Sequence, residues 1–164
     1  MSGVKNYLAF DFGASSGRAI LGKLHEGKLE LEEIHRFSND PVEINGHYYW
    51  DTFRLFYEIK QGLIKYAQGN YGPLEGIGID AWGVDFGLIG PSGELLGVPY
   101  HYRDSRTDGM MEEADKLMGR RRIFDESGIS HEFFNTVNQL LAMVKQDSPC
   151  LLYTSPSPRD AHES

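Results

Sequence analysis

Apolar and polar residues follow one another along the N-terminal part of the chain in patterns that are typical of β-strands. Residues 6–12 form a short apolar and aromatic run that ends at Gly13, which suits a buried strand closed by a turn. Residues 18–24 and 29–37 alternate polar and apolar side chains around a turn at 25–28, as the two strands of a hairpin do. Together these segments predict an antiparallel meander of three strands.

The apolar spacing changes to a helical period after the meander. Asp51 can cap a helix here, and Gly69 can end it. The apolar stripe of this predicted helix contains Phe56, Ile59, Leu63 and Tyr66. One amphipathic helix is therefore expected to follow the three strands and to pack on their sheet.

More strands and helices are expected beyond this helix. Residues 76–82 and 84–89 have the composition of strands, and another strand-like stretch runs into Tyr100 and Tyr102. The stripe of a second helix contains Met110, Met111, Ala114, Leu117 and Met118, and that of a third, with Asn135 as its cap, contains Val137, Leu140, Leu141 and Val144. We assign the methionine-rich stripe to the core. The predicted fold class is α/β, with a mixed sheet in which helix-linked strands follow the meander.

Length, charge and cysteine content narrow the classes of function. A chain of 164 residues is the size of one domain. Its 16 basic and 24 acidic side chains give a net charge of −8, which repels nucleic acid, so neither DNA nor RNA is an expected partner. No apolar run approaches the ~18 residues of a membrane span and no secretory signal is evident, so we expect a soluble, cytoplasmic protein without a membrane partner. The single cysteine, Cys150, offers neither an internal disulfide nor a zinc cluster.

The end of the chain differs in composition from the rest. From Cys150 onward the sequence is CLLYTSPSPRDAHES, in which Ser, Pro and Thr replace the apolar periodicity, as in an unstructured tail. The stretch 150–160 is also similar to an in-frame translation of the transposase adapter used in sequencing libraries. Two origins stay open, an adapter-derived extension and a natural disordered tail. We expect a truncated N-terminal domain over residues 1–149 and an unstructured tail over residues 150–164.

The strongest local signal for chemistry is the segment 11–18, DFGASSGR. An acidic residue ends the predicted strand, and small residues form a tight turn before an arginine. Glycines permit positive φ, successive backbone N–H groups can form an anion-binding nest and serine hydroxyls add donors, so the turn suits a phosphate group. Asp11 would then face the phosphates, with a water-bridged Mg²⁺ between them. The alternative is a hairpin turn that binds nothing.

A second candidate is the segment 78–85, GIDAWGVD, in which two carboxylates and an indole flank a glycine. Sugar sites use this mixture, because carboxylates accept hydrogen bonds from hydroxyls, an indole packs on the C–H face of the sugar and glycine leaves room for it. The alternative is structural: Trp82 belongs to the core and Asp80 caps a turn.

A third candidate is the segment 100–106, YHYRDSR, which is dense in polar groups just before the second predicted helix. Its alternative is a helix N-terminus that Ser105 or Asp104 caps. Most histidines lie at no ligand spacing and are assigned to the surface or the core rather than to a metal. These are His25, His35, His47 and His131.

Taken in order, these segments resemble the N-terminal domain of the FGGY carbohydrate kinases, which have the actin-like, ribonuclease H-like ATPase fold. The resemblance runs from about residue 6 to residue 147. It rests on DFGASSGR at 11–18, EIHRF at 33–37, GIDAWGVDF at 78–86 and YRDSRT at 102–107, and on the shorter phrases SGI at 127–129 and FNT at 134–136. Within the family, ASSGR together with WGVD is similar to the kinases of L-rhamnulose, whereas xylulose and glycerol kinases carry other residues there.

The resemblance implies a reaction and a set of binding residues. The reaction is the ATP-dependent transfer of the γ-phosphate to the 1-hydroxyl of L-rhamnulose. The implied magnesium residue is Asp11, acting through water. The implied contacts to the ATP phosphates are Ala14, Ser15, Ser16, Gly17 and Arg18. The implied sugar contacts are Gly83 and, on weaker grounds, Trp82, Arg103 and Asp104.

The resemblance also implies that essential parts lie outside this chain. In the family, the general-base aspartate, in a His-Asp-Thr phrase, and the adenosine-binding segments come after the position of residue 149. No catalytic residue is therefore expected in this chain, its partner would be the missing second domain, and alone it would be inactive. Two alternatives stay open: another ketose kinase of the family, acting on xylulose or fuculose, and a non-catalytic actin-like protein that binds sugar or nucleotide.

Overall fold

The computed structural model describes residues 3–153, and these form two compact units. The first unit contains the residues up to Pro41 and Asp51–Gly83, and the second contains Val42–Trp50 and the residues from Val84 onward. Residues 42–50 join the second unit because they bond with a later part of the chain: the Trp50 N–H donates to the carbonyl of Pro99 at 2.9 Å. The sequence predicted one domain over residues 1–149, without this division.

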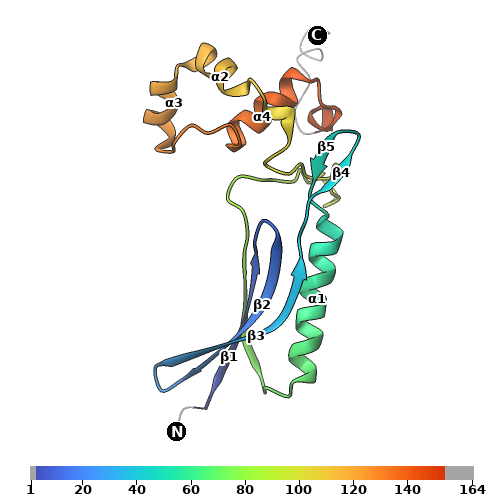
Figure 1. Ribbon diagram of the computed structural model, residues 1–164, viewed down its shortest axis with the longest axis vertical. Coiled ribbons are helices and arrows are strands. Elements are labelled where there is room, and N and C mark those ends of the chain that lie inside the picture. The colour runs from blue at the N-terminus through green and yellow to red at the C-terminus, as the bar shows by residue number, and fades with distance from the viewer. Residues whose placement is uncertain (1–2, 154–164) are drawn as a thin grey trace. The chain divides into compact units, whose positions relative to one another are not determined.

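The first unit is a mixed sheet covered by one long helix (Figure 1). Strand β1 pairs antiparallel with β2 and parallel with β6, and β2 pairs antiparallel with β3, which confirms the predicted meander. The helix α1 connects the meander to β6 and runs along the sheet. In order across the sheet the strands are β3 (Lys28–Ser38), β2 (Ser16–His25), β1 (Lys5–Phe12) and β6 (Leu74–Asp80), and the helix is α1 (Thr52–Gln68).

The core of the first unit follows from the alternation along β1 and β2. Alternate residues of β1 from Asn6 to Phe12 and of β2 from Gly17 to Leu21 are buried, as the two-residue period of a strand requires. Gly62 allows the helix to approach closely, because a Cβ there would lie 2.6 Å from the ring of Phe10. The buried cluster consists of Leu8, Phe10, Phe12, Ala19, Leu21, Phe37 and Tyr66.

The ends of α1 match the sequence prediction, and part of its stripe does not. The Asp51 carboxylate accepts from the Arg54 N–H at 2.9 Å and caps the first turn. Gly69 ends the helix with an ordinary φ of −76°, so its role is not a left-handed cap. Tyr66 is buried, but Phe56 is 61% exposed, so its place in the core-facing stripe was wrong.

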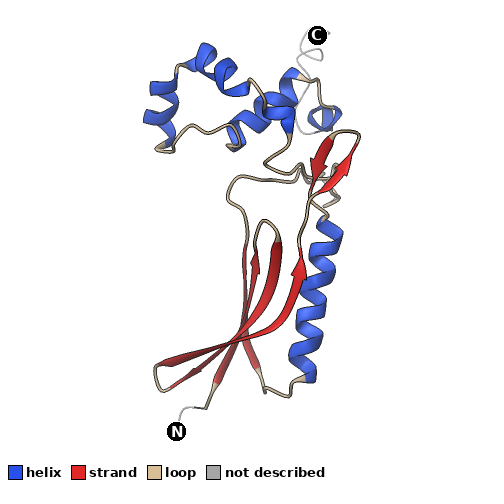
Figure 2. Ribbon diagram, in the orientation of Figure 1, coloured by secondary structure: helices blue, strands red, loops and turns tan. Residues whose placement is uncertain are grey.

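The second unit is mostly helical and carries one short hairpin (Figure 2). The predicted second and third helices are confirmed as α2 and α4. The hairpin and the helix α3 were not predicted. The elements are β4 (Val42–Ile44), β5 (His47–Tyr49), η1 (Ser105–Thr107), α2 (Met110–Met118), α3 (Arg120–Ser127), α4 (Thr136–Lys145) and η2 (Pro149–Tyr153).

The strands predicted over 84–89 and toward Tyr102 do not form. Residues 84–104 are irregular apart from two isolated bridges, between Ile89 and Leu95 and between Tyr49 and Tyr100. Glycines and prolines recur through this stretch, and they disfavour a continuous ladder because glycine costs backbone entropy and proline lacks an N–H donor. The sheet therefore does not continue past β6 in the described residues.

The core assignment of the methionine-rich stripe in α2 was wrong in part, and the buried face of α4 is not its predicted apolar stripe. In α2, Ala114 is buried, but Leu117 and Met118 are exposed. In α4 the helix is rotated relative to the prediction: polar side chains occupy much of its buried face, and the apolar side chains Val137, Leu140 and Val144 are exposed. Asn135 precedes α4, but its side chain makes no capping hydrogen bond.

Ordered structure continues beyond the predicted end of the domain. Cys150 lies in the 3-10 helix η2, and its Sγ donates to the carbonyl of Leu96 at 2.8 Å, so the prediction of an unstructured tail from residue 150 is corrected for residues 150–153. The rest of the tail lies outside the described residues. No helix among residues 3–153 is both long enough and apolar enough to span a membrane.

Candidate functional site

The loop between β1 and β2 is held in place by a side chain from the end of β3. The N–H of Gly13 donates to the carbonyl of Ser16 at 3.0 Å and closes the turn. The buried Asn39 adds two further bonds: its Nδ2 donates to the Gly13 carbonyl at 2.7 Å, and its backbone N–H donates to the Ser15 carbonyl at 3.0 Å. Sequence analysis missed Asn39, because nothing local to it indicates that it reaches this loop.

The glycines of this loop serve close packing rather than an unusual backbone. A Cβ on Gly13 would lie 2.8 Å from the Ser16 carbonyl oxygen, and a Cβ on Gly17 would lie 2.1 Å from the ring of Phe37. Neither glycine has positive φ, so the expected nest built on positive φ is not what forms here. Both positions nevertheless require glycine, because any side chain would collide with the fixed neighbours.

The tip of the loop presents hydrogen-bond donors. Within residues 3–153, the backbone N–H groups of Ala14 and Ser15 and the hydroxyls of Ser15 and Ser16 make no hydrogen bond to protein. Ser15 is exposed, while Ala14 and Ser16 are half-buried. Unsatisfied donors on a rigid loop suit an anion such as a phosphate group.

Charged side chains stand next to one another at the same end of the sheet. Arg18 and Asp11 are register partners on β2 and β1, and Arg18 Nε lies 2.9 Å from Asp11 Oδ2. Asp80 is the register partner of Asp11 on β6. Register partners project from the same face of a sheet, so the guanidinium and the two carboxylates line up across three strands. One cation therefore stands beside two carboxylates.

The second candidate segment leaves the sheet beside this loop. β1 and β6 are adjacent parallel strands, so the loop after β1 and residues 81–83 after β6 start from the same edge. Trp82 stacks on Phe12 with ring centroids 6.4 Å apart and packs against the core, as its structural interpretation predicted. Gly83 is exposed, and a Cβ there would meet nothing within 4 Å.

In the second unit, Asp104 has a structural role. It is 2% exposed, and its carboxylate accepts from the Tyr48 N–H at 2.7 Å and from the Arg106 N–H at 3.0 Å. His47 Nδ1 lies 3.1 Å from Asp104 Oδ1. These contacts argue against the predicted sugar contact of Asp104, because a buried carboxylate that already receives protein donors is closed to a ligand. The alternative, Asp104 as the cap of a helical turn, is confirmed at η1.

Arg103, next to Asp104, remains open to solvent. Its guanidinium lies 5.2 Å from the ring centre of Tyr102, and its backbone N–H donates to His101 Nδ1 at 3.0 Å. Burial lowers the pKa of His101 below its ordinary value, which favours the neutral ring that accepts this bond. The arginine side chain is thus positioned by its backbone and by an aromatic face, with its charge exposed.

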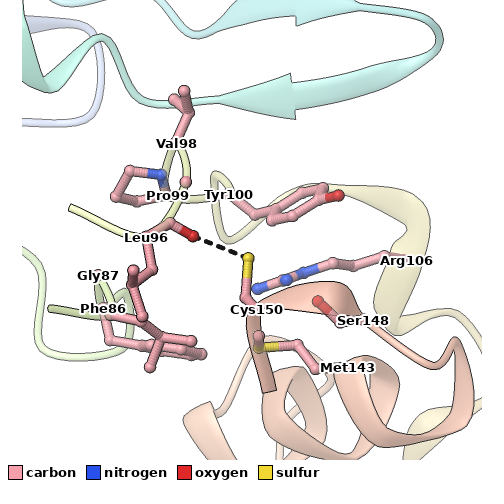
Figure 3. Close-up of a pocket in the computed structure, with 12 residues that line it drawn as sticks. Phe86, Gly87, Leu96, Val98, Pro99, Tyr100, Arg106, Met143, Ser148 and Cys150 are labelled. Atoms are coloured by element: carbon pink, nitrogen blue, oxygen red, sulfur yellow. Dashed lines mark hydrogen bonds between the residues drawn. The ribbon is translucent and has the colours of Figure 1, made fainter. Parts of the chain in front are cut away.

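A small cavity lies elsewhere in the second unit (Figure 3). Its volume is about 40 Å³, room for about one water molecule and too little for a sugar or a nucleotide. The Arg106 guanidinium points into it, stands 3.9 Å from the ring centre of Tyr100 and donates to Gln139 Oε1 at 2.6 Å. Burial lowers the pKa of Arg106 from its ordinary value. This cavity is a packing feature and not the candidate site.

The described residues contain no cluster of three or more metal-ligating side chains. A metal at the candidate site would therefore take most of its ligands from water and from a bound substrate. Mg²⁺ binds in this way, since it keeps several waters and often uses one or two carboxylates together with phosphate oxygens. The side-by-side carboxylates of Asp11 and Asp80 fit that donor set.

No family model matches the chain. Rhamnulokinases from three bacteria are similar to it in sequence: that of Oceanobacillus iheyensis is 44% identical over 145 residues, that of Halalkalibacterium halodurans 46% over 142 and that of Bacteroides thetaiotaomicron 45% over 136. These alignments cover 88%, 86% and 83% of this chain and 30%, 30% and 28% of the respective relatives. The chain thus spans about 30% of the length of the curated relatives it matches.

Solved sugar kinases share the fold at low sequence identity. A gluconate kinase from Lactobacillus acidophilus matches with a TM-score of 0.78 at 14% identity, over 92% of this chain and 30% of that one. A xylulose kinase from the same organism matches with a TM-score of 0.78 at 15% identity, over 91% and 30%. A glycerol kinase from Plasmodium falciparum, solved with ADP, matches with a TM-score of 0.72 at 14% identity, over 91% and 30%. These matches confirm the predicted actin-like α/β fold, and the sequence matches show that the chain is related to the rhamnulokinases of the FGGY carbohydrate kinase family.

Proposed function

We propose that this chain is part of a kinase that transfers the γ-phosphate of ATP to the 1-hydroxyl of L-rhamnulose. One observation carries the proposal: the donor-rich loop after β1 and the open glycine after β6 leave the sheet at the same edge, from adjacent parallel strands. Ligands of α/β sheets bind outside the carboxyl ends of the strands. Phosphoryl transfer depends on holding donor and acceptor together, and this edge brings together an anion-binding loop and an open backbone position.

The loop residues are proposed to bind the phosphates of ATP. The free N–H groups of Ala14 and Ser15, the hydroxyls of Ser15 and Ser16 and the guanidinium of Arg18 supply donors and positive charge. Gly17 contributes by letting the loop pack against Phe37 without a side chain in between. A phosphate that approaches Arg18 competes with Asp11 for its charge, so nucleotide binding would loosen that ion pair.

Asp11 is proposed to hold Mg²⁺ through water. Its carboxylate is half-exposed at the end of β1, and Asp80 stands beside it. The magnesium ion would supply positive charge that neutralises the phosphate oxygens. Among the described residues, the carboxylates of Asp11 and Asp80 and the guanidinium of Arg18 supply charges at this end of the sheet.

Gly83 is proposed as the main sugar contact, through its backbone, and Trp82 and Arg103 are proposed as further contacts. Gly83 can offer only its peptide groups, and nothing covers the place of its missing side chain. Trp82 precedes Gly83 in the chain, and its ring stacks on Phe12 and packs against the core. Arg103 has an exposed charge that can donate to hydroxyls. The choice of L-rhamnulose over other ketoses rests on the relatives at 41–46% identity.

The test uses a full-length protein that contains this segment, expressed from the gene recovered with its flanking DNA. ADP release is measured with L-rhamnulose, L-fuculose and D-xylulose. We expect the highest kcat/KM with L-rhamnulose, and Arg18→Gln should raise the KM for ATP. No sugar-dependent ADP release, or a higher kcat/KM with D-xylulose, would contradict the proposal. The 164-residue chain is the negative control, since it is expected to release no ADP.

A further inference from the structure

The carboxylate of Asp85 receives donors from three separate segments of the second unit. Its Oδ2 accepts from Trp50 Nε1 at 2.5 Å and from the Tyr102 N–H at 3.2 Å, while its Oδ1 accepts from Gln139 Nε2 at 3.0 Å. Trp50 follows β5, Tyr102 comes just before Arg103, and Gln139 lies in α4. Bonds to an ionised acceptor are shorter and stronger than bonds between neutral groups. The Asp85 carboxylate therefore connects three segments that are far apart in the sequence.

The backbone next to Asp85 is fixed as well. The carbonyl of Val84 accepts from Thr136 Oγ1 at 2.7 Å and from Gln139 Nε2 at 3.2 Å, and both donors lie in α4. Gln139 is 1% exposed, so water does not compete for these bonds. Its Oε1 is itself occupied by Arg106, which fixes the direction in which its amide points. Residues 84–85 are thus held by main-chain and side-chain bonds to one rigid helix.

This anchor lies directly after Gly83. A glycine can contact a ligand only through its own N–H and C=O, and the position of those groups depends on the chain to either side. On one side, β6 fixes the chain through Asp80, the register partner of Asp11. On the other side, the bonds to Val84 and Asp85 fix it. The backbone that follows Gly83 is therefore fixed by bonds within the second unit.

The two carboxylates of the segment 78–85 differ in what they can do. Asp80 is exposed, and within residues 3–153 its carboxylate makes no hydrogen bond or ion pair to protein. Both oxygens of Asp85 receive donors from the protein, so a sugar hydroxyl would have to displace a bond that the fold uses. Asp85 is therefore unsuited to bind sugar directly, although its residue type and its place in the motif suggest it.

We infer that Asp85 is a positioning residue for the sugar site: its carboxylate holds the backbone that leaves Gly83 against Tyr102 and α4. The inference rests on the proposed function, since the sugar contact of Gly83 is part of it. The same carboxylate also accepts from the N–H of Tyr102, the residue that precedes Arg103. Its loss should weaken sugar binding and leave the ATP-binding loop unaffected.

The experiment is the variant Asp85→Asn in the full-length protein, with separate KM values for L-rhamnulose and ATP. An asparagine has one acceptor oxygen, so its amide N–H₂ must face at least one of the three donors. We expect the KM for L-rhamnulose to rise about tenfold or more and the KM for ATP to change less than about twofold. Asp108→Asn is the matched control, because Asp108 is an exposed carboxylate of the same unit, and it should change neither value.

A second variant distinguishes a loss of positioning from a general loss of folding. Thr136→Val removes the other side-chain donor to the Val84 carbonyl and leaves Asp85 and Gln139 in place. It should raise the KM for L-rhamnulose and leave the KM for ATP unchanged, a selective effect that a general loss of stability would not produce. Circular dichroism and a thermal midpoint for each variant show whether it is folded.

The outcomes separate the two proposals. If the wild-type protein does not phosphorylate L-rhamnulose, the proposed function fails, and this inference fails with it. If the wild type is active and a folded Asp85→Asn variant keeps its sugar KM, only the positioning role of Asp85 is overturned. The same holds if the variant raises the KM for ATP as much as the KM for the sugar.

Discussion

The two units of this chain bury polar side chains in different proportions. In the first unit the core is apolar and forms between the sheet and α1, around Phe10 and Phe12, and the buried polar side chains are Asn6, Asn39 and Glu58. In the second unit polar side chains make up about half of the buried set, beside apolar side chains such as Trp50, Ile123 and Met143. The buried polar side chains of the second unit are His101, Asp104, Arg106, Thr107, Asn138 and Gln139.

This difference shows which kind of core a sequence pattern can predict. An apolar core needs only apolar residues at the right period, and the alternation along β1 and β2 provides it. A buried polar residue needs a partner, because an unsatisfied polar group in the interior is costly. Gln139 finds its partners at Val84 and Asp85, more than 50 positions away, and no local pattern encodes that pairing.

The largest expected effect tests the apolar core. Phe10→Ala removes a ring that is 1% exposed and sits beneath Gly62 of α1. We expect a loss of about 3–5 kcal/mol in the free energy of unfolding, because the substitution loses the transfer energy of the ring and leaves a cavity. Urea denaturation gives the size of the effect, and hydrogen exchange followed by mass spectrometry shows where it falls. Ile79→Ala, in the same sheet but 57% exposed, is the control and should cost far less.

The next effect tests the polar core. Asp104→Asn replaces an acceptor that serves the N–H groups of Tyr48 and Arg106, and the new amide cannot accept from all of them. We expect a loss of about 2–3 kcal/mol, because buried donors are left without partners. Increased hydrogen exchange should appear in residues 42–50 and 100–107. An effect no larger than that of the exposed control Asp108→Asn would show that the polar core contributes little.

In the candidate site, too, the sequence predicts residues that form a local pattern and misses residues whose partners lie far away in the sequence. The segment 11–18 could be named as a candidate from the sequence, because small residues and hydroxyls next to a strand are a local signal. Asn39 and Gln139 were missed, since each acts on residues far away in the sequence. Asp104 was placed with the sugar contacts because the residue type alone does not show that its oxygens already receive protein donors.

A smaller effect is expected at the N-termini of α1 and α4, the longest helix of each unit. Asp51 caps α1 with its side chain, whereas Asn135 donates to the Ser130 carbonyl and caps nothing in α4. Asp51→Ala should lower the free energy of unfolding by about 1 kcal/mol, and Asn135→Ala by about 0.5 kcal/mol or less. The measurement is the urea midpoint of each variant. Equal losses would mean that the Asn135 bond to the loop matters as much as a helix cap.

The smallest effect concerns an exposed link between α2 and α4. Hydrogen bonds from Lys116 and then Lys145 lower the pKa of Glu113 from 4.5 to about 2. A lowered carboxyl pKa stabilises the folded state above the unfolded pKa near 4.5, and this contribution is lost as the pH falls through that value toward about 2. Because the pair is exposed, the contribution is small and salt weakens it further.

Glu113→Gln should therefore flatten the pH dependence of the urea midpoint between pH 4.5 and 2 and leave its value above pH 6 only slightly lower. The control is Glu112→Gln, a neighbouring exposed carboxylate that makes no ion pair among residues 3–153. If both variants follow the wild-type curve, the lysine contacts of Glu113 do not connect α2 to α4 in solution. The stability of the second unit would then depend on its buried polar bonds, and the contrast with the apolar first unit would be sharper still.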